Sequence, residues 1–479
     1  MNPENKPDIG AEALTDLKSH FCLGAVLLMI GGAHLVPETA DFDRAKLVLI
    51  GILASAILLW SLEVLDAAVS ALLVMVAMVL NGIAPLSRVW GEMGDPILGL
   101  IVAVYVVAFA VKKSGLDRRI ALAIIAAAGG RAGLVLLAVM ATTYVFAFFI
   151  PTAMGRAAIL LSVAGGLTGA GGMTDRNLLK GVFIGIPYVS LLASSATITG
   201  ASGMVYAAGL FAGQLGFSWS YMAWLAAFTP IALVTLALSW VLLLWLFPPQ
   251  RGEEAALAEG LRRQRADLGK VTPGEWKVLA ILFLMLGGWM SHDLYGLDTA
   301  TVALVAAVLF FLPGIEIIRW RETAKAVNWG SLVLFACGLA LADAMAATGL
   351  AKTLALHLAS LLDGAPLWAA AAGVALLMAL VRLGLNNITS ALAVALPVVF
   401  SLAPGLGVSP VWLGMVAIAG SCLAFLLPSQ SIATLASYGM RHFGMRDLRR
   451  AGLGVTGLLA LAIVLAALYY WPLIGYSPA

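Results

Sequence analysis

The chain has 479 residues, of which 62% are hydrophobic and 11% are charged, and its formal net charge is +3. A soluble domain is nearer half apolar and a quarter charged, so this composition excludes an ordinary soluble protein and predicts a polytopic membrane protein. No basic run indicates nucleic-acid binding, and the scattered Cys22, Cys337 and Cys422 have neither metal-ligand spacing nor the pattern of a disulfide framework.

Eleven apolar segments predict membrane-spanning helices. The first follows a polar N-terminal stretch that lacks the basic start and cleavage site of a signal peptide, so we expect it to be retained. The segments lie near residues 21–36, 47–62, 66–84, 97–111, 183–213, 223–247, 277–292, 299–314, 329–347, 410–437 and 452–473.

Two further apolar regions, residues 133–165 and 366–401, are interrupted near their middles by Pro, Gly or polar residues. Each is about 33 residues long, which is too long for one span and too short for two full spans of roughly 20 residues. We therefore predict two re-entrant hairpins, each with two half-helices that meet at a tip near mid-bilayer. Irregular backbone at that depth needs cover from protein or from a watery cavity.

The predicted layout contains an inverted repeat. An N-terminal tail and first helix occupy residues 1–46, and a charged cytoplasmic linker over 248–276 joins the repeats, residues 47–247 and 277–479. Each repeat has two spans, one span, a hairpin, an interrupted span and a final span, so its five crossings invert the second copy. With the N-terminus in the cytoplasm and the C-terminus outside, about 22 of the 28 Lys and Arg residues lie inside. Such an organisation predicts a secondary transporter of the cell (inner) membrane, with a binding site at the midplane.

Four segments resemble a known family. The stretches LWSLEVLDAAVSALLVMVAMVLNGIAPL, FAVKKSGLDRRIA, GLDTATVALVAAVLFFLPG and VNWGSLVLFACGLAL are similar to the divalent anion:sodium symporters of the ion transporter superfamily. The resemblance runs from about residue 30 to residue 473. It implies a homodimer with a static scaffold domain and a transport domain that slides as an elevator. Such proteins carry di- or tricarboxylates or sulfate, usually with sodium.

In this family a Ser-Asn-Thr signature at each hairpin tip, and a Gly/Thr/Pro/Asn-rich break in each following span, carry the sodium and substrate sites. The second tip, LGLNNITSALAVALP, keeps much of the signature as Asn386, Asn387 and Thr389. The first tip departs from it, because isoleucine, proline and Thr152 occupy positions 150–152.

The two breaks also keep part of the family pattern. The first, SSATITGASGM, keeps Thr197 and Gly200 but has Met204 where the family has Asn. The last long span, LLPSQSIATLASYG, lacks the usual Pro-Pro-Asn. It keeps Pro428 and the polar residues Ser429, Gln430, Ser431 and Thr434.

These departures bear on sodium, which needs several hard oxygen ligands, as other hard cations do. Pro151 has no side-chain oxygen and Met204 offers only a thioether, so the first sodium site is eroded. The second site keeps enough oxygens to bind Na+, and its candidate ligands are Asn387, Thr389, Ser429, Gln430 and Ser431. We expect no organic cofactor.

Arg156 lies about one turn past the first tip, near the positive end of the returning half-helix. The helix dipole and desolvation both oppose a cation there. One hypothesis is that Arg156 supplies the positive charge that sodium supplies in the relatives. Its planar guanidinium group would then bind an anionic substrate through paired hydrogen bonds. The alternative is that it snorkels to the cytoplasm or pairs with a carboxylate and only holds the hairpin.

Arg382 is the second charge in a hairpin, and Asp343 lies in a nearby span. Intramembrane charges usually pair, so we predict a structural Arg382–Asp343 pair. The alternatives are that Arg382 contacts substrate or that Asp343 is a proton-coupling group with a raised pKa. Glu63 and Asp66 are interpreted as helix caps at the scaffold edge.

Together these features predict a secondary active transporter of a small, dicarboxylate-like anion, working in the lipid bilayer and coupled to sodium through the second site. Proton coupling, exchange or uniport are the alternatives, as is a membrane sensor or enzyme that borrowed the scaffold. No nucleophile–base arrangement or cofactor motif supports an enzyme, so no catalytic residue is predicted. The residues predicted to bind substrate are Thr152, Arg156, Asn386, Asn387, Thr389, Thr197, Ser431 and Thr434.

Overall fold

The computed structural model describes residues 9–169, 172–250, 254–291, 296, 298–361 and 364–478. Helices joined by loops account for the architecture of these residues, as the predicted all-α class requires. Residues 1–8 of the predicted N-terminal tail and residues 251–253 of the predicted linker lie outside the described residues.

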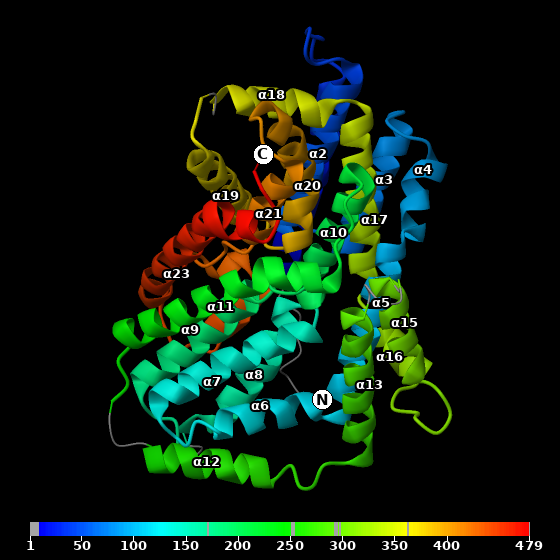
Figure 1. The fold of residues 1–479 in the computed structure, drawn as a ribbon. Helices are drawn as coiled ribbons and strands as arrows, with labels where there is room; N and C mark the ends of the chain where they lie inside the picture. The colour runs from blue at the N-terminus through cyan, green and yellow to red at the C-terminus, as the bar shows by residue number, and fades with distance from the viewer. Residues whose placement is uncertain are drawn as a thin grey trace.

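The described residues of the first half of the chain form eleven α-helices, and Figure 1 labels those from α2 to α11. They are α1 (Ile9–Ala33), α2 (Arg44–Leu62), α3 (Ala67–Leu80), α4 (Leu86–Gly91), α5 (Pro96–Ser114), α6 (Leu116–Ala126), α7 (Ala132–Val145), α8 (Ala153–Leu167), α9 (Arg176–Leu192), α10 (Ser202–Leu215) and α11 (Tyr221–Leu246).

The linker contains α12 (Glu254–Ala266), and a similar order of elements then follows. The helices of the second half are α13 (Pro273–Met290), α15 (Thr299–Leu309), α16 (Trp320–Ala326), α17 (Trp329–Ala347), α18 (Leu350–Leu361), α19 (Leu367–Gly384), α20 (Ile388–Gly405), α21 (Pro410–Gly420), α22 (Ile432–Gly439) and α23 (Met445–Leu465). A π-helical turn (Ala466–Tyr470) and a last short helix, α24 (Trp471–Leu473), extend α23.

Seven of the described helices are long and apolar enough to cross a membrane: α2, α5, α11, α17, α19, α20 and the continuous stretch Met445–Leu473. Other apolar helices, among them α3, α7, α8, α15 and α21, are shorter. The second predicted hairpin consists of α19 and α20, each of 18 residues, and the first consists of the shorter α7 and α8. The number of spans and the re-entrant path of the hairpins therefore stay predictions.

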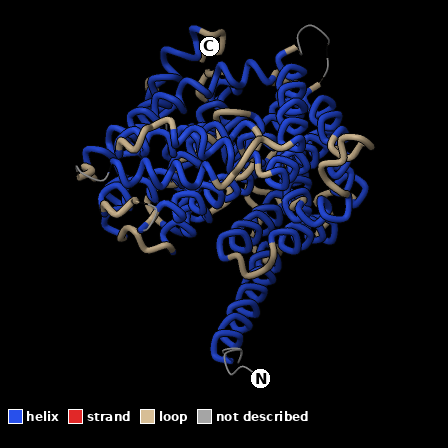
Figure 2. The backbone as a smooth tube through the Cα atoms, turned by 90° about the horizontal axis from the view of Figure 1, so that it is seen from below, coloured by secondary structure: helices blue, strands red, loops and turns tan. Residues whose placement is uncertain are grey.

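Two helices lie across opposite ends of the molecule. In Figure 1, α12 runs along the bottom beside α6, and α18 runs along the top. Seen from below, α1 projects away from the remaining helices (Figure 2). Its side chains Phe21, Leu27 and Leu28 are 79%, 72% and 76% exposed. An apolar surface of this kind is expected to face lipid or another protein.

The two interrupted spans are broken where the sequence is rich in Ser, Thr, Gly and Pro. The first consists of α9 and α10 with a break over residues 193–201, and the last consists of α21 and α22 with a break over residues 421–431. Each break exposes backbone groups that a continuous helix would satisfy, so the surrounding side chains must supply partners.

Prolines inside α9 and α11 each remove one backbone hydrogen bond, and side chains from the second half of the chain replace the missing donors. Pro187 and Pro230 have no N–H, so the carbonyls four residues earlier, those of Phe183 and Ala226, lose their helical donor. The hydroxyl of Ser437 donates to the first carbonyl. The hydroxyl of Tyr470 donates to the second, at 2.6 Å.

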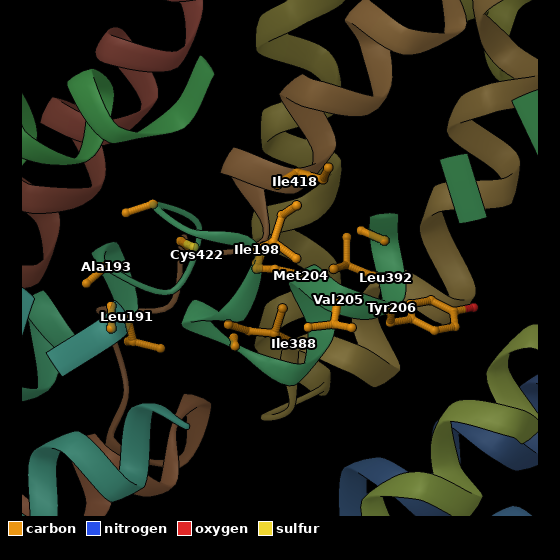
Figure 3. Packing of buried hydrophobic residues seen from close by; sticks show 14 of the residues in the cluster. Leu191, Ala193, Ile198, Met204, Val205, Tyr206, Ile388, Leu392, Ile418 and Cys422 are labelled. Carbon is orange, nitrogen blue, oxygen red and sulfur yellow. The ribbon is translucent and has the colours of Figure 1, made fainter. Parts of the chain in front are cut away.

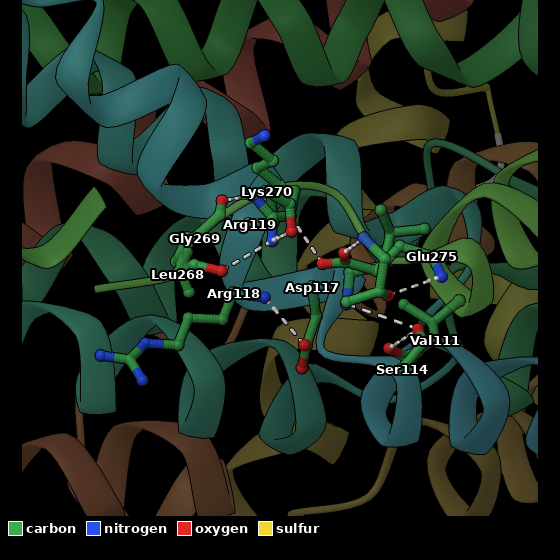
Figure 4. Close-up of polar contacts among 11 residues, drawn as sticks. Val111, Ser114, Asp117, Arg118, Arg119, Leu268, Gly269, Lys270 and Glu275 are labelled. Atoms are coloured by element: carbon green, nitrogen blue, oxygen red, sulfur yellow. Dashed lines mark hydrogen bonds and ion pairs between the residues drawn. The ribbon is translucent and has the colours of Figure 1, made fainter. Parts of the chain in front are cut away.

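At the lower end of the molecule α6 is fixed to the linker and to α13 (Figure 4). Arg119 on α6 donates to Glu275 Oε1 on α13 at 2.6 Å. The same guanidinium donates to the carbonyls of three linker residues, Leu268, Gly269 and Lys270, at 3.0 to 3.2 Å. Glu275 also completes a capping box with Thr272 at the start of α13.

Candidate functional site

Both predicted hairpin tips and both breaks border one cavity of about 460 Å³. Four helices begin at its wall. They are α8 after Thr152, α10 after Ala201, α20 after Asn387 and α22 after Ser431. The first N–H groups of a helix lack intrahelical acceptors and carry the positive end of the helix dipole. Four such ends around one cavity make it a suitable environment for an anion.

The four helix starts differ in how they are capped. Thr152 Oγ1 accepts from Gly155 N at 3.0 Å, and Asn387 Oδ1 accepts from Thr389 N at 2.8 Å. Ala201 has no side chain that can cap α10, and the Ser431 side chain makes no cap hydrogen bond to α22. The Ser431 hydroxyl is therefore not committed to its own helix.

Close packing holds the parts of this site together. Figure 3 shows Ile198 and Met204, from the first break and α10, among Ile388 and Leu392 of α20 and Ile418 of α21. Met204, which stands where the family has Asn, is fully buried in this apolar cluster and does not line the cavity.

Part of the cavity lining comes from helices that precede the hairpins in each half. Tyr105 on α5 lines the cavity, as do Asn328 and Ser331 at the start of α17. Sequence reasoning did not select these residues, because α5 and α17 are apolar around most of their circumference and show no polar face. It also overlooked Ser194 and Ser202, which line the cavity from the first break and the start of α10.

Four of the predicted substrate residues, Thr152, Asn386, Asn387 and Ser431, line the cavity. The other four are buried and lie outside its lining: Arg156, Thr197, Thr389 and Thr434. Of these, the Thr197 hydroxyl donates to the Ala147 carbonyl at 3.1 Å, which ties the first break to the end of α7.

Arg156 is fully buried behind the first tip, so it does not reach solvent by snorkelling. One terminal nitrogen of its guanidinium donates to the carbonyls of Ile150 at 2.7 Å and Gly200 at 2.5 Å. The other donates to the Ser190 carbonyl at 2.6 Å and to Ser194 Oγ at 2.8 Å. The side chain thus joins the tip, the end of α9 and the first break.

The predicted Arg382–Asp343 pair is wrong. Asp343 Oδ2 instead accepts from Arg88 Nε on the short helix α4 at 2.6 Å. Arg382 is fully buried, lines the cavity, and donates to the carbonyls of Leu385 at 2.6 Å and Gln430 at 3.0 Å. The Asp343 face of α17 packs toward α4, whereas Arg382 lies on the face of α19 that meets the second break.

The side chains predicted to bind sodium do not form a set of free oxygens. The Gln430 amide oxygen accepts from Leu426 N and Leu427 N at 2.8 and 2.9 Å, so it caps the break. Ser429 is exposed and lies outside the cavity lining, and Thr389 Oγ1 lies 3.4 Å from Ser202 Oγ. The Asn387 oxygen is also used as a cap, whereas the Ser431 hydroxyl makes no cap contact, so the sodium site stays a prediction.

A second cavity of about 330 Å³ lies on the other side of the second tip, and Asn386 and Asn387 border both cavities. Asn386 Nδ2 donates to Glu63 Oε1 at 2.6 Å across this region. Glu63 and Asp66 occupy the C-cap of α2 and the N-cap of α3, as their interpretation as caps predicted. Glu63 therefore also links α2 to the tip.

Comparisons with known proteins agree with this architecture. Residues 17–476 match the sodium:sulfate symporter transmembrane region. A membrane protein of Cupriavidus necator is 25% identical over 96% of the chain and 94% of its own length. The sodium-dependent dicarboxylate transporter SdcS of Staphylococcus aureus strain USA300 is 26% identical over 87% of the chain and 84% of its own length.

A solved structure supports the fold independently of close sequence similarity. The YdaH transporter of Alcanivorax borkumensis superposes with a TM-score of 0.57 at 16% identity, over 82% of this chain and 88% of that one. The predicted all-α membrane fold is therefore confirmed.

These findings define a multi-pass membrane transporter rather than an enzyme. The chain belongs to the sodium:sulfate symporter family, which confirms the predicted resemblance to divalent anion:sodium symporters. It is accordingly a secondary transporter of small anions.

Proposed function

We propose that the chain transports a small dicarboxylate, which binds in the cavity between the two hairpin tips. The observation that carries this proposal is the convergence of four helix N-termini and the buried Arg382 on one cavity. A volume of about 460 Å³ suits a small molecule. No lining residue is acidic, so an anion meets no opposing carboxylate there.

The polar lining supplies hydrogen-bonding groups from two sets of elements. Thr152, Asn387 and Ser431 lie at the tips and the second break, whereas Tyr105 and Ser331 lie on α5 and α17. We assign substrate binding to these groups. The dicarboxylate specificity named for the SdcS relatives supports the choice of substrate class.

The resemblance to the divalent anion:sodium symporters supports an elevator movement in a homodimer. The cavity is lined by α5 and the start of α17 as well as by the hairpins and breaks, so sliding of one group of helices past the other would open it and release a substrate. The helices α12 and α18, which cross opposite ends in Figure 1, support a layout with the N-terminus and linker inside and the C-terminus outside the cell.

The names of the family and of the SdcS relatives support sodium coupling. The contacts of the predicted ligands oppose it, because Gln430 uses its amide oxygen as a cap and its carbonyl as the acceptor for Arg382. Coupling through the second site therefore lacks support from the residues themselves.

The proposal is tested with purified protein in proteoliposomes and with a matched pair of variants. Ser431→Ala removes a hydroxyl that lines the cavity, and Ser429→Ala removes an exposed hydroxyl two residues away that does not. Loss of one hydrogen bond worth about 1 kcal/mol predicts a roughly fivefold higher KM for labelled succinate in the first variant only. Equal KM values in both variants and the wild type would place the binding site elsewhere.

A further inference from the structure

The second cavity, of about 330 Å³, lies between the α2–α3 turn and the second hairpin tip. Glu63 and Asp66 line it from the turn, whereas Asn386 and Ser390 line it from the tip and the start of α20. Its lining contains two carboxylates and neither Lys nor Arg. This cavity therefore has the opposite sign of charge to the first, whose lining holds Arg382 and no acidic residue.

Neither carboxylate is paired with a cation, because the ion pairs of the described residues involve other side chains. Glu63 Oε1 accepts from Asn386 Nδ2 at 2.6 Å, and Asp66 Oδ1 accepts from Ala68 N at 2.8 Å. The second oxygen of each carboxylate has no partner among the described residues. Two anionic oxygens thus remain for a ligand that carries a positive charge.

Two buried side chains in the same lining also lack partners. Ser70 on α3 is 0% exposed and Trp60 on α2 is 5% exposed. Neither the hydroxyl nor the indole N–H has a hydrogen-bond partner in the part of the chain that the structure describes. Trp60 precedes Glu63 by three residues and Ser70 follows Asp66 by four, so each lies about one helical turn from a carboxylate. Since buried polar groups almost always find partners, these two indicate a polar ligand beside the carboxylates.

The four side chains together define the chemistry of that ligand. A primary ammonium group has three N–H donors, which suit the two carboxylate oxygens and the Ser70 hydroxyl. The indole N–H of Trp60 can only donate, so the ligand must also carry an acceptor oxygen. We propose that this cavity binds a small primary amino alcohol, with its ammonium group between Glu63 and Asp66 and its hydroxyl against Trp60.

Two other classes of ligand fit the lining less well. A hard metal ion needs about six oxygen ligands, whereas Leu59, Val64 and Leu334 give part of this cavity an apolar wall. These side chains suit the short carbon chain of an amino alcohol. A zwitterion, such as an amino acid or a phospholipid headgroup, brings an anionic group next to two carboxylates, and no cation in the lining offsets the repulsion.

Binding is measured by the thermal stability of the purified protein, titrated with linear propanolamine at constant pH and ionic strength. Propylamine lacks the hydroxyl and propanediol lacks the charge, so these molecules serve as matched ligands. We expect propanolamine to stabilise the protein, propylamine to bind about fivefold more weakly, and propanediol to have no effect. Equal stabilisation by propanediol and propanolamine would overturn the proposal, as would stabilisation by the amines no greater than that by NaCl at the same ionic strength.

Variants test whether the ligand binds in this cavity. Asp66→Asn removes one negative charge but keeps an oxygen that can cap α3, and the Kd for propanolamine should rise about tenfold. Asp43→Asn makes the same change at the N-cap of α2, outside the cavity, and should leave the Kd unchanged. Trp60→Phe removes the N–H, so propanolamine and propylamine should bind it equally. Equal Kd values in the two Asp variants, or a preference for propanolamine that survives Trp60→Phe, would contradict the proposed site.

Occupancy of this cavity should also control transport. Asn386 and Asn387 border both cavities, so a ligand held between the α2–α3 turn and the second tip opposes movement of that tip. This step rests on the proposed transport of a dicarboxylate, whereas the binding measurements do not. Propanolamine at about ten times its Kd should lower the maximal rate of succinate uptake about tenfold without changing KM, because only the unoccupied protein moves.

The uptake assay separates failure of the inference from failure of the proposed function. A higher KM with an unchanged maximal rate would place the amine in the substrate cavity and overturn the inference. An unchanged rate at saturating propanolamine would overturn the control of transport. Absence of succinate uptake without any amine would reject the proposed function alone, since the binding of propanolamine is measured without succinate.

Discussion

The start of α10 and the second hairpin tip approach each other so closely that only glycine fits at position 203. A Cβ there would lie 2.7 Å from Ile388 Cγ2 and 3.0 Å from Thr389 N. Comfortable contacts between such atoms are about 3.5 to 4.0 Å, so alanine must displace the tip by roughly 0.5 to 1 Å. Thr389 N belongs to the backbone, and a side-chain rotation cannot relieve that contact.

Gly203→Ala is therefore expected to weaken substrate binding. Overpacking of this kind costs about 1 to 3 kcal/mol, and the higher helix propensity of alanine returns at most about 1 kcal/mol. These figures leave a net loss of up to about 2 kcal/mol, and a loss of about 1.4 kcal/mol in binding corresponds to a tenfold higher Kd for succinate. The binding constant is measured by titrating thermal stability of the purified protein with succinate.

Gly213→Ala provides the control in the same helix. A Cβ at Gly213 would have no neighbour within 4 Å, so this variant should bind succinate with wild-type affinity and unfold at the same or a slightly higher temperature. The reasoning is refuted if Gly203→Ala binds as the wild type does, or if both glycine variants lose affinity to the same extent.

Three further predictions concern contacts that hold the helices together. Arg119→Met strands a buried carboxylate and should lower stability by roughly 3 kcal/mol, seen as a lower Tm, whereas the exposed Arg263→Met should not. Tyr188→Phe removes a hydroxyl that lies 2.8 Å from two carbonyls, in the second break and α23, and should lower stability by about 1 to 3 kcal/mol in the same assay. Glu63→Ala and Asn386→Ala should be non-additive, so the double variant loses little more stability than either single variant. Additive losses would show that this contact does not form.

The apolar pattern predicted most of the long helices, because a long run of hydrophobic residues has few alternatives to a membrane helix. The two breaks were also recognisable, since Ser, Thr, Gly and Pro interrupt an otherwise apolar stretch at each. The amphipathic helices α6 and α18 escaped the prediction, because a search for spans ignores short helices that lie across the ends of the molecule.

The candidate site was predictable only at its tips. Thr152 and Asn387 stand out as polar caps next to helix starts, and both line the cavity. Tyr105 could not be recognised, because its hydroxyl is a single polar group on an apolar helix. The sequence does not show whether such a group faces the cavity or the surrounding helices. The partner of Asp343 was missed for a different reason: Arg88 is 255 residues away in sequence, and only the packing of α4 against α17 brings them together.

The hydrogen bonds that Ser437 and Tyr470 make to α9 and α11 have a consequence for the order in which the protein is assembled. Ser437 and Tyr470 lie 254 and 244 residues after the carbonyls that they satisfy. During synthesis the first half of the chain therefore enters the bilayer before either hydroxyl exists. The two carbonyls therefore lack these protein partners until the segments that contain Ser437 and Tyr470 have been made. These segments complete the hydrogen bonding of α9 and α11, and a chain truncated before them would leave both carbonyls without these donors.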